Sequence, residues 1–386
     1  MKIGIPKEIR AGETRVATSP DSVKRFVALG VEVLVEAGAG EQASIMDAAL
    51  QAVGARIVPG TAALYDEADL VLKVQRPMTE AEGGPDELGL MKKSTILIGL
   101  LQPLYQRAQV EDYAKRGVTT FAMELVPRIS RAQTMDALSS QSNVAGYKAV
   151  LDAAGSFGRM LPMMMTAAGT IPAARVVIFG AGVAGLQAIA TARRLGALVS
   201  AFDVRPAVKE QVESLGATFI EVKSEEIATA ETKGGYAREM SADYQRRQRD
   251  VIHETMRKQD IAITTAQIPG KPAPRLIDAE MVRDMKPGSV IVDLAADTGG
   301  NCELTEPGRV VVKHGVTIIG HTNYAARVPT DCSILYARNL YNFVAPMVDK
   351  ASRGLKIDFG DEVIKGALLT RDGQVVNPAL LQGKEL

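Results

Sequence analysis

The sequence has no tryptophan, only two cysteines and only three histidines among its 386 residues. Two cysteines, Cys302 and Cys332, are too few for a framework of several disulfides or for a zinc site made of four thiolates. They suit a chain that works in a reducing compartment. Lysine plus arginine number 45, as do aspartate plus glutamate, so neither nucleic acid nor an anionic membrane surface is favoured as the main partner.

Histidine, the residue that enzymes use most often as a general acid or base, is scarce. The three are His253, His314 and His321, and none is close in sequence to the polar segment Met123–Ser142. The chain has no H-E-x-x-H motif, and its most apolar region, 160–192, is interrupted by prolines and glycines. The sequence therefore predicts no metal site and no membrane span, and offers no obvious group for proton transfer.

A glycine-rich stretch near the middle of the chain carries the clearest signal. Gly180, Gly182 and Gly185 have the spacing G-x-G-x-x-G. They stand between a short apolar run, Val176–Phe179, and a helical pattern over Val183–Leu195. This strand–turn–helix context is the one that a dinucleotide fingerprint requires, because the pyrophosphate binds at the helix N-terminus against backbone N–H groups.

The residues after the next strand indicate which dinucleotide binds. The run Leu198–Phe202 predicts a strand, and Asp203 stands at its end. A carboxylate there accepts hydrogen bonds from ribose hydroxyls and repels a 2′-phosphate, which favours NAD over NADP. Arg205 argues the other way, since an arginine at this place can hold a 2′-phosphate. We give Asp203 more weight because it stands at the strand end itself.

Strand and helix patterns alternate along most of the chain, which predicts parallel sheets covered by helices. We expect an α/β protein with two doubly wound, Rossmann-like domains joined by long helices, with the nucleotide in the interdomain cleft. The first domain is assigned to residues 1–140 plus 326–386, and the NAD-binding domain to 141–325. We further expect a helix from about residue 143 to 158, a loop over Pro162–Pro172, and a hairpin or strand that includes Val363–Ile364.

Two polar segments have compositions that suit a site. Met123–Ser142 is dense in hydrogen-bonding side chains and lies between two α/β units, so we place it at the cleft. Glu221–Asp260 is highly charged and contains Gly234-Gly235-Tyr236 as a hinge and tip. Composition alone leaves two interpretations of it open: a solvated surface helix, or a lid over the nucleotide.

Several motifs together resemble one protein family. They are KIGIPKEIRAGETRVATSP at the start, VLKVQRPMT at Val71–Thr79, PRISRAQTMDALSSQSN at Pro127–Asn143, TTAQIPGKPAP and KPGSVIVDLAADTGGN. Over essentially the whole chain they resemble the soluble NAD(H)-binding component (domain I, alpha subunit) of proton-translocating NAD(P) transhydrogenase, a family related to alanine dehydrogenase. The resemblance implies hydride transfer between NADH and NADP⁺ held on a partner subunit, coupled to proton translocation by membrane subunits (Si-specific/Re-specific). It also implies a homodimer at the cytoplasmic face of the inner membrane.

The resemblance also implies roles for residues of this chain. Four of them surround the nicotinamide and count as catalytic: Arg128, Gln133, Asp136 and Ser139. The other implied cofactor-binding residues are Ile129, Ser130, Arg131, Gly180, Gly182, Val183, Ala184, Asp203, Val204, Arg205, Gly235, Tyr236, Gln267 and Ile268. Residues 234–236 are the tip of a loop that closes on the nucleotide, which favours the lid. Ring-to-ring hydride transfer needs no general base, in agreement with the scarcity of histidine.

Two alternatives remain. An alanine dehydrogenase would use a substrate-binding lysine at Lys73 and a catalytic aspartate at Asp297, and both are present. Its catalytic histidine belongs in Ile98–Leu104, which contains none. A module that senses NAD would bind nucleotide through the same motifs and transfer nothing.

Overall fold

The computed structural model describes residues 1–222, 241–349 and 351–381. Its contacts divide the chain into two compact units. Unit 1 comprises Met1–Gln141 and Ala326–Leu386, and unit 2 comprises Ser142–Ala325. In the described part of the chain, no helix combines the length and the hydropathy that crossing a membrane requires.

Unit 1 is built on an eight-stranded sheet with the order β19-β18-β6-β5-β4-β1-β2-β3. The strands from β6 to β3 in this order pair in parallel, and β18 and β19 are antiparallel additions at one edge. The strands are β1 (Lys2–Ile5), β2 (Glu32–Glu36), β3 (Arg56–Val58), β4 (Leu70–Gln75), β5 (Ile96–Leu100), β6 (Thr119–Ala122), β18 (Leu368–Arg371) and β19 (Gln374–Val375).

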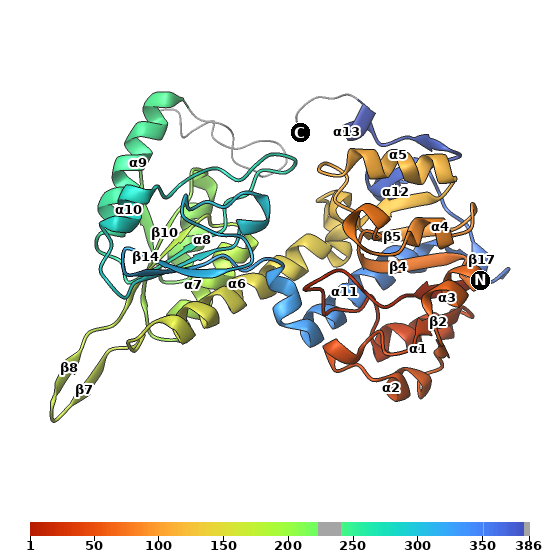
Figure 1. The fold of residues 1–386 in the computed structure, drawn as a ribbon, viewed down its shortest axis with the longest axis horizontal. Coiled ribbons are helices and arrows are strands. Elements are labelled where there is room, and N and C mark those ends of the chain that lie inside the picture. Colours follow the sequence, from red (N-terminus) through yellow and green to blue (C-terminus); the bar gives the residue numbers. More distant parts are fainter. Residues whose placement is uncertain (223–240, 350, 382–386) are drawn as a thin grey trace. The chain divides into compact units, whose positions relative to one another are not determined.

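Helices cover both faces of this sheet, so its central strands are buried on both sides (Figure 1). Helices α1 (Pro20–Ala28) and α11 (Pro329–Val344) contribute to the apolar core on one face. Helices α3 (Thr61–Glu67) and α5 (Arg107–Arg116) contribute to the core on the other. The shorter elements of the unit are α2 (Asp47–Gln51), α4 (Glu87–Leu90), α12 (Glu362–Ala367), α13 (Pro378–Leu381), β16 (Val348–Asp349) and β17 (Gly354–Leu355).

Unit 2 is built on a seven-stranded sheet with the order β11-β10-β9-β12-β13-β15-β14. All neighbours pair in parallel except β14 with β15. The chain order reverses between β9 and β12, and ligands of open α/β sheets bind at such a switch point. The strands are β9 (Arg175–Phe179), β10 (Leu198–Phe202), β11 (Thr218–Ile220), β12 (Ile261–Thr264), β13 (Val290–Asp293), β14 (Val310–Lys313) and β15 (Val316–Ile319).

The sheet of unit 2 is also covered on both faces. Helices α6 (Ala137–Ser156), α7 (Val183–Arg194) and α8 (Lys209–Ser214) pack on one face. Helices α9 (Ala242–Met256) and α10 (Ala279–Arg283) pack on the other. Two mainly parallel sheets, each between layers of helices, confirm the predicted doubly wound class.

The predicted loop at Pro162–Pro172 is wrong. This stretch forms an antiparallel hairpin of β7 (Met164–Thr166) and β8 (Gly169–Ile171), which projects from the sheet of unit 2 (Figure 1). The hairpin has no core of its own, and the side chain of Met165 is 74% exposed. A strand that buries one face alternates apolar and polar residues in sequence. This hairpin buries no face, so the sequence carried no such alternation to indicate it.

Two other predicted boundaries need correction. Helix α6 begins at Ala137, about six residues before the expected start, because the Asp136 carboxylate accepts the Ser139 backbone N–H at 2.8 Å and so caps the helix. Val363 and Ile364 lie in α12 and not in a strand. There the Asp361 carboxylate accepts both of their backbone N–H groups and starts the helix.

Candidate functional site

The turn between β9 and α7 requires glycine at two places. Gly180 has φ +98°, in the left-handed region where glycine is strongly favoured. A Cβ on Gly185 would lie 1.8 Å from the carbonyl oxygen of Gly180, so the helix can approach the strand this closely only without a side chain. Thr265, which follows β12, donates its hydroxyl to that same carbonyl at 3.0 Å. The turn therefore lies at the switch point of the sheet.

Gly182 leaves open space above the same turn. It is the N-cap of α7, and a Cβ on it would meet Arg205 Nη2 at 4.0 Å, with nothing described lying closer. The N–H groups of the first helical turn have no partners within a helix, and the helix dipole is positive at this end. Val183 and Ala184 begin the helix here. The geometry is that of an anion site able to admit a pyrophosphate.

Asp203, directly after β10, faces this turn. Its Oδ2 accepts the Ala181 backbone N–H at 2.7 Å, and its Oδ1 accepts the Arg205 backbone N–H at 2.9 Å. The Arg205 guanidinium completes a bidentate ion pair, with Nε to Oδ1 at 2.9 Å and Nη2 to Oδ2 at 2.8 Å. In the sequence Asp203 favours NAD and Arg205 favours NADP, and in the structure the two side chains form one ion pair.

The remaining predicted residues of unit 2 follow Asp203 in sequence or follow β12, the strand next to β9. Half-buried Val204 packs at the edge of the core beneath α9 and α10. Gln267 and Ile268 follow β12, and the exposed Gln267 donates its amide to the Leu294 carbonyl at 3.4 Å. Gly235 and Tyr236, with the rest of the predicted lid tip, lie outside the described residues.

The second set of predicted residues lies in unit 1, after β6. The turns η3 (Met123–Leu125) and η4 (Ser130–Met135) carry the segment to the start of α6. Covered residues interrupt the exposed ones: Ala132 is buried, and half-buried Ile129 packs on the core of the unit. The residues of the segment that are exposed to solvent are Arg128, Ser130, Arg131, Gln133 and Thr134.

Two members of this set are bonded within the segment itself. The Asp136 carboxylate caps α6 and also accepts the Ser139 hydroxyl at 2.6 Å. Arg131 instead binds a different element, in a bidentate pair with Asp361 at 2.9 and 3.0 Å. Asp361 caps α12, so this pair ties η4 to the start of that helix.

Helix α11 holds the same segment through two asparagines that the sequence analysis did not select. Asn339 and Asn342 both donate their amides to the Thr134 carbonyl, at 2.9 and 3.1 Å. Asn339 also accepts the Ser140 hydroxyl at 2.7 Å. These partners are about 200 residues apart in the chain, and no local motif marks the pairing.

A buried group of charges lies at the carboxyl end of β4. The Lys73 side chain is 0% exposed, and its ammonium contacts Glu87 at 2.8 Å and Glu8 at 3.3 Å. The Tyr65 hydroxyl donates to the same Glu87 oxygen at 2.7 Å. Although burial alone lowers the pKa of Lys73, the two carboxylates give a net rise, so the lysine stays charged and ion-paired.

The other residue of the dehydrogenase alternative, Asp297, lies in unit 2 after β13. Its Oδ2 accepts the Asn323 backbone N–H at 3.1 Å. The described residues bring together no group of three histidine, cysteine or acidic side chains that could hold a metal ion. The prediction that the protein uses no metal stays a prediction.

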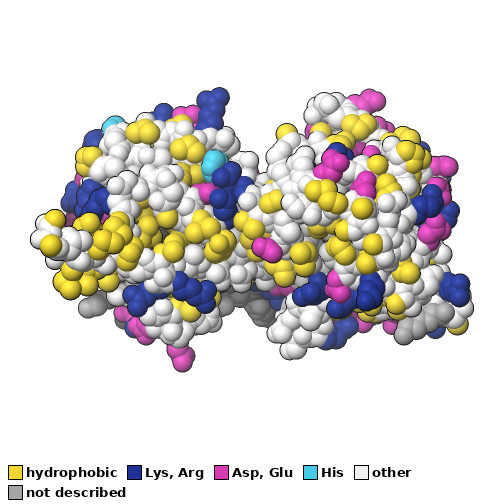
Figure 2. Space-filling view, turned by 90° about the horizontal axis from the view of Figure 1, so that it is seen from below, with side chains coloured by type: hydrophobic (Ala, Val, Ile, Leu, Met, Phe, Trp, Pro, Cys, Tyr) yellow, Lys and Arg dark blue, Asp and Glu magenta, His cyan; other side chains and the backbone are white. Residues whose placement is uncertain are grey.

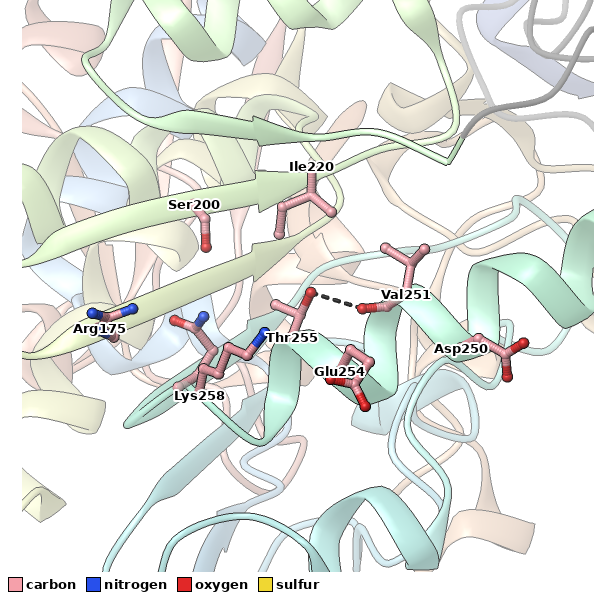
Figure 3. Close-up of a pocket in the computed structure, with 9 residues that line it drawn as sticks. Arg175, Ser200, Ile220, Asp250, Val251, Glu254, Thr255 and Lys258 are labelled. Carbon is pink, nitrogen blue, oxygen red and sulfur yellow. Dashed lines mark hydrogen bonds between the residues drawn. The ribbon is translucent and has the colours of Figure 1, made fainter.

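A cavity of about 470 Å³ in unit 2 lies apart from the glycine turn. It opens beside α9, next to Arg175 at the amino end of β9, whereas the turn follows the carboxyl end of that strand (Figure 3). Neither the fingerprint glycines nor Asp203 lines it. Its lining residues are Arg175, Ser200, Ile220, Asp250, Val251, Glu254, Thr255, Lys258 and Gln259.

Comparison with known proteins gives consistent results for both halves of the chain. Residues 4–145 match the family model "Alanine dehydrogenase/PNT, N-terminal domain", and residues 149–378 match "Alanine dehydrogenase/PNT, C-terminal domain". A protein of Rhodospirillum rubrum named as the first part of NAD(P) transhydrogenase subunit alpha is 60% identical, over 98% of this chain and 99% of its own length. A crystal structure of transhydrogenase from Sinorhizobium meliloti is 47% identical, with a TM-score of 0.84, and covers 98% of this chain and 100% of that one. Alanine dehydrogenase of Halomonas elongata is 30% identical, over 99% of this chain and 96% of its own length.

Proposed function

The chain belongs to the alanine dehydrogenase/PNT family, and from that premise we propose that it is the NAD(H)-binding alpha subunit of a proton-translocating NAD(P) transhydrogenase. Hydride passes between NADH on this chain and NADP⁺ on a partner subunit, with the Si-specific/Re-specific pairing of the two nucleotides. Membrane subunits couple the transfer to proton movement and hold this chain at the cytoplasmic face of the inner membrane.

One observation carries the proposal: the switch point of unit 2 is open and suited to a dinucleotide, whereas Lys73 of unit 1 is closed. The space above Gly182 is suited to a pyrophosphate, and Asp203 stands directly after β10, where this fold contacts the adenosine ribose. The buried ammonium of Lys73 is ion-paired with Glu87 and Glu8, so the carboxylate of an amino-acid substrate would have to compete with two carboxylates of the protein itself. These contacts support a nucleotide-binding subunit over an amino-acid dehydrogenase.

The residues of the two units take different parts in the proposal. In unit 2, Val183, Ala184 and the fingerprint glycines bind the pyrophosphate, Asp203 to Arg205 bind the adenosine ribose, and Gln267 and Ile268 flank the adenosine. In unit 1, Arg128, Gln133, Asp136 and Ser139 orient the nicotinamide, with residues 129–131 beside them. Bound NADH supplies the hydride. The chain's own groups position the ring and exclude water, and none has to accept a proton.

Arg128 and Gln133 are suited to this task because their side chains are exposed while the backbone that carries them is held. Thr134 is fixed by two asparagines of α11, and Arg131 by Asp361. A fixed backbone with exposed polar side chains is what an orienting site requires. By the same reasoning Asp136 and Ser139 shape the platform, since they bond to each other.

The homodimer is also part of the proposal. Hydrophobic side chains gather in a band on one face of unit 2 (Figure 2). The hairpin contributes exposed apolar side chains at Met163, Met164, Met165 and Ile171. A monomer seldom exposes so many neighbouring apolar side chains, and a second copy of this chain would bury them. Sedimentation of the purified chain tests this, with a dimer as the expected result.

The experiment for the proposed function measures hydride transfer to NADP⁺ held on the NADP(H)-binding component of a transhydrogenase. We expect the chain with NADH to support transfer and Arg128→Ala or Gln133→Asn to slow it at least tenfold, with the fold intact by circular dichroism. Absence of transfer by a chain that binds NADH would favour the nucleotide-sensing alternative. Unchanged rates in both folded variants would remove these residues from the site.

A further inference from the structure

We propose that the cavity beside α9 is a second small-molecule site on unit 2, and that it takes a short zwitterion with a carboxylate at one end and an ammonium group at the other. Its volume of about 470 Å³ is within the size range of ligand pockets. No residue of the glycine turn lines it. The inference therefore concerns a different place from the dinucleotide site and does not depend on the proposed function.

The end of the cavity at β9 carries two positive charges. Arg175 exchanges backbone hydrogen bonds with the chain that follows α9: its N–H donates to the Asp260 carboxylate at 2.8 Å, and its carbonyl accepts the Asp260 N–H at 2.9 Å. This pairing brings Lys258 to the same end of the cavity (Figure 3). Within the described residues, the charged groups of Arg175 and Lys258 form no ion pair and no hydrogen bond. An anionic group would gain charge-assisted hydrogen bonds from both.

Gln259 adds a buried polar group to this end. It lines the cavity and is only 8% exposed. Its backbone carbonyl accepts the Ser289 hydroxyl at 3.5 Å, but its side-chain amide has no hydrogen-bond partner in the part of the chain that the structure describes. An amide buried without a partner is unfavourable, and the carboxylate of a ligand would supply the missing acceptor.

The other end of the cavity is acidic, and the wall between the two ends is apolar. Asp250 and Glu254 are four residues apart on α9, which places them on the same face of the helix. Glu254 pairs with Arg257 at 2.9 Å, whereas Asp250 has no ion pair among the described residues. Ile220 and Val251 lie between the two charged ends (Figure 3). An ammonium group would therefore find its partner at Asp250.

This distribution of charge suits a zwitterion better than a simple anion or a simple amine, because each of those would use only one end. The methylene chain of the zwitterion would cover the apolar wall. Positions 250 and 258 are about 12 Å apart along the helix axis, and the reach of their side chains shortens the remaining span to that of a chain of about six carbon atoms. An α-amino acid carries both charges on one carbon and is too short to reach both ends.

The test uses 6-aminohexanoate as the probe, with hexanoate and hexylamine as matched molecules that each lack one of its charges. Binding to the purified chain is followed through the NMR signals of the probe. We expect 6-aminohexanoate to bind at least tenfold more tightly than either matched molecule. Saturating NADH should leave its affinity unchanged, because the glycine turn lies elsewhere in unit 2.

Charge variants test each end of the cavity. Arg175→Gln and Lys258→Gln remove the cations, and Asp250→Asn removes the acid. Each should weaken the binding of 6-aminohexanoate at least fivefold. Lys24→Gln is the control, because it removes the charge of an exposed lysine on α1 of unit 1 and should leave the affinity unchanged.

Gln259→Leu separates a ligand-binding role from a structural one. Since the amide has no described partner within the protein, its replacement by an apolar side chain of similar size should leave the melting temperature unchanged or raise it. The same variant should weaken the binding of 6-aminohexanoate at least fivefold. A glutamine with a merely structural role would instead lower the melting temperature and leave binding unchanged.

Selective binding of 6-aminohexanoate that is weakened in these variants supports the inference. Equal binding of the three molecules, displacement of the probe by NADH, or unchanged affinity in the folded variants overturns it. Absence of binding to the natural chain also overturns it. None of these results alters the proposed function, which hydride transfer tests separately.

Discussion

The two units have the same kind of sheet, but their switch points are filled in opposite ways. In unit 1 the order reverses between β1 and β4, and there Glu8 accepts the Val74 backbone N–H at 2.6 Å while Lys73 and Glu87 complete a buried group of charges. In unit 2 it reverses between β9 and β12, and there Gly180 and Gly182 leave backbone without side chains. The first switch point is filled by the protein's own charged side chains, whereas the glycines of the second leave open space beside the start of α7.

The difference shows why a fold of this class does not by itself indicate a site. A parallel sheet places its strand ends together wherever the order reverses, and the side chains decide whether a ligand can use the place. A charge group with its partners supplied internally has little to gain from an external carboxylate. Helix N–H groups with open space above them do gain from an anion.

The largest expected effect is on the closed switch point. Glu87→Ala removes the 2.8 Å partner of Lys73 and the acceptor of Tyr65, which leaves a buried ammonium with only Glu8. We expect a loss of about 3–5 kcal/mol in the free energy of unfolding, measured by urea denaturation. Glu67→Ala is the control, because Glu67 pairs with Lys2 and Arg56 at the surface, where water screens the pairs, and its loss should cost far less. Equal losses in the two variants would mean that the buried group is not a stabilising closure.

The next effect concerns the open switch point. Gly182→Ala adds a Cβ that meets no described atom closer than 4.0 Å, so the fold should persist while the methyl group occupies the space of the pyrophosphate. We expect NADH affinity to fall by about two orders of magnitude, roughly 2.7 kcal/mol. Gly155→Ala is the matched control, since a Cβ there meets nothing within 4 Å and lies in α6. Tight NADH binding by Gly182→Ala would show that the dinucleotide does not approach this turn.

A buried carboxyl in unit 1, that of Glu124, should make the stability of the protein depend on pH. Glu124 follows β6; its Oε1 accepts the Gln102 N–H, and its Oε2 is buried without a described partner. Burial raises the pKa of this carboxyl from 4.5 to about 7, so the folded state holds the proton more tightly than the unfolded chain does. Stability from this group is present below about pH 4.5 and is lost as the pH rises through 7.

Glu124→Gln should remove the loss of folding stability that Glu124 causes as the pH rises, because glutamine does not ionise. We expect the variant to be more stable than the natural chain at pH 8, by at most about 3 kcal/mol, with the difference disappearing near pH 4. Urea denaturation across this range provides the measurement. Parallel stability profiles for the two proteins would contradict the raised pKa.

The smallest effect is expected from the residues that hold the 128–139 segment. Asn339→Ala loses both the bond to the Thr134 carbonyl and the acceptor of the Ser140 hydroxyl. A small displacement of the segment should slow hydride transfer about tenfold with NADH affinity nearly unchanged. Asn342→Ala is the control, because it removes only the second bond to Thr134. A loss confined to NADH affinity would mean that Asn339 acts on binding and not on ring orientation.

Sequence reasoning succeeded where the signal is local. The glycine spacing, the apolar strand runs and the alternation of elements depend on neighbouring residues, and they predicted the class of fold and the order of the elements around Gly180. It failed for the hairpin of β7 and β8, which buries no face in the chain, and for Val363, whose helix depends on the cap by Asp361.

The residues that hold the site could not be found in this way. Asn339 and Asp361 reach the 128–139 segment from more than 200 residues away, and only the folded chain brings them together. Likewise Lys73 looked available for a substrate in the sequence, because nothing local indicates that Glu87 and Glu8 enclose it.

The measurement that tests the central claim most directly uses the purified chain alone. It is incubated with NAD⁺ and a panel of L-amino acids, and with NADH, 2-oxoacids and ammonium, while the absorbance of the reduced nicotinamide is followed and NADH binding is measured in parallel. We predict NADH binding without turnover, because the glycine turn of unit 2 is suited to a dinucleotide, whereas Lys73 of unit 1 is already ion-paired with Glu8 and Glu87. Steady turnover of any amino acid would contradict this account and identify a dehydrogenase that works without the expected histidine.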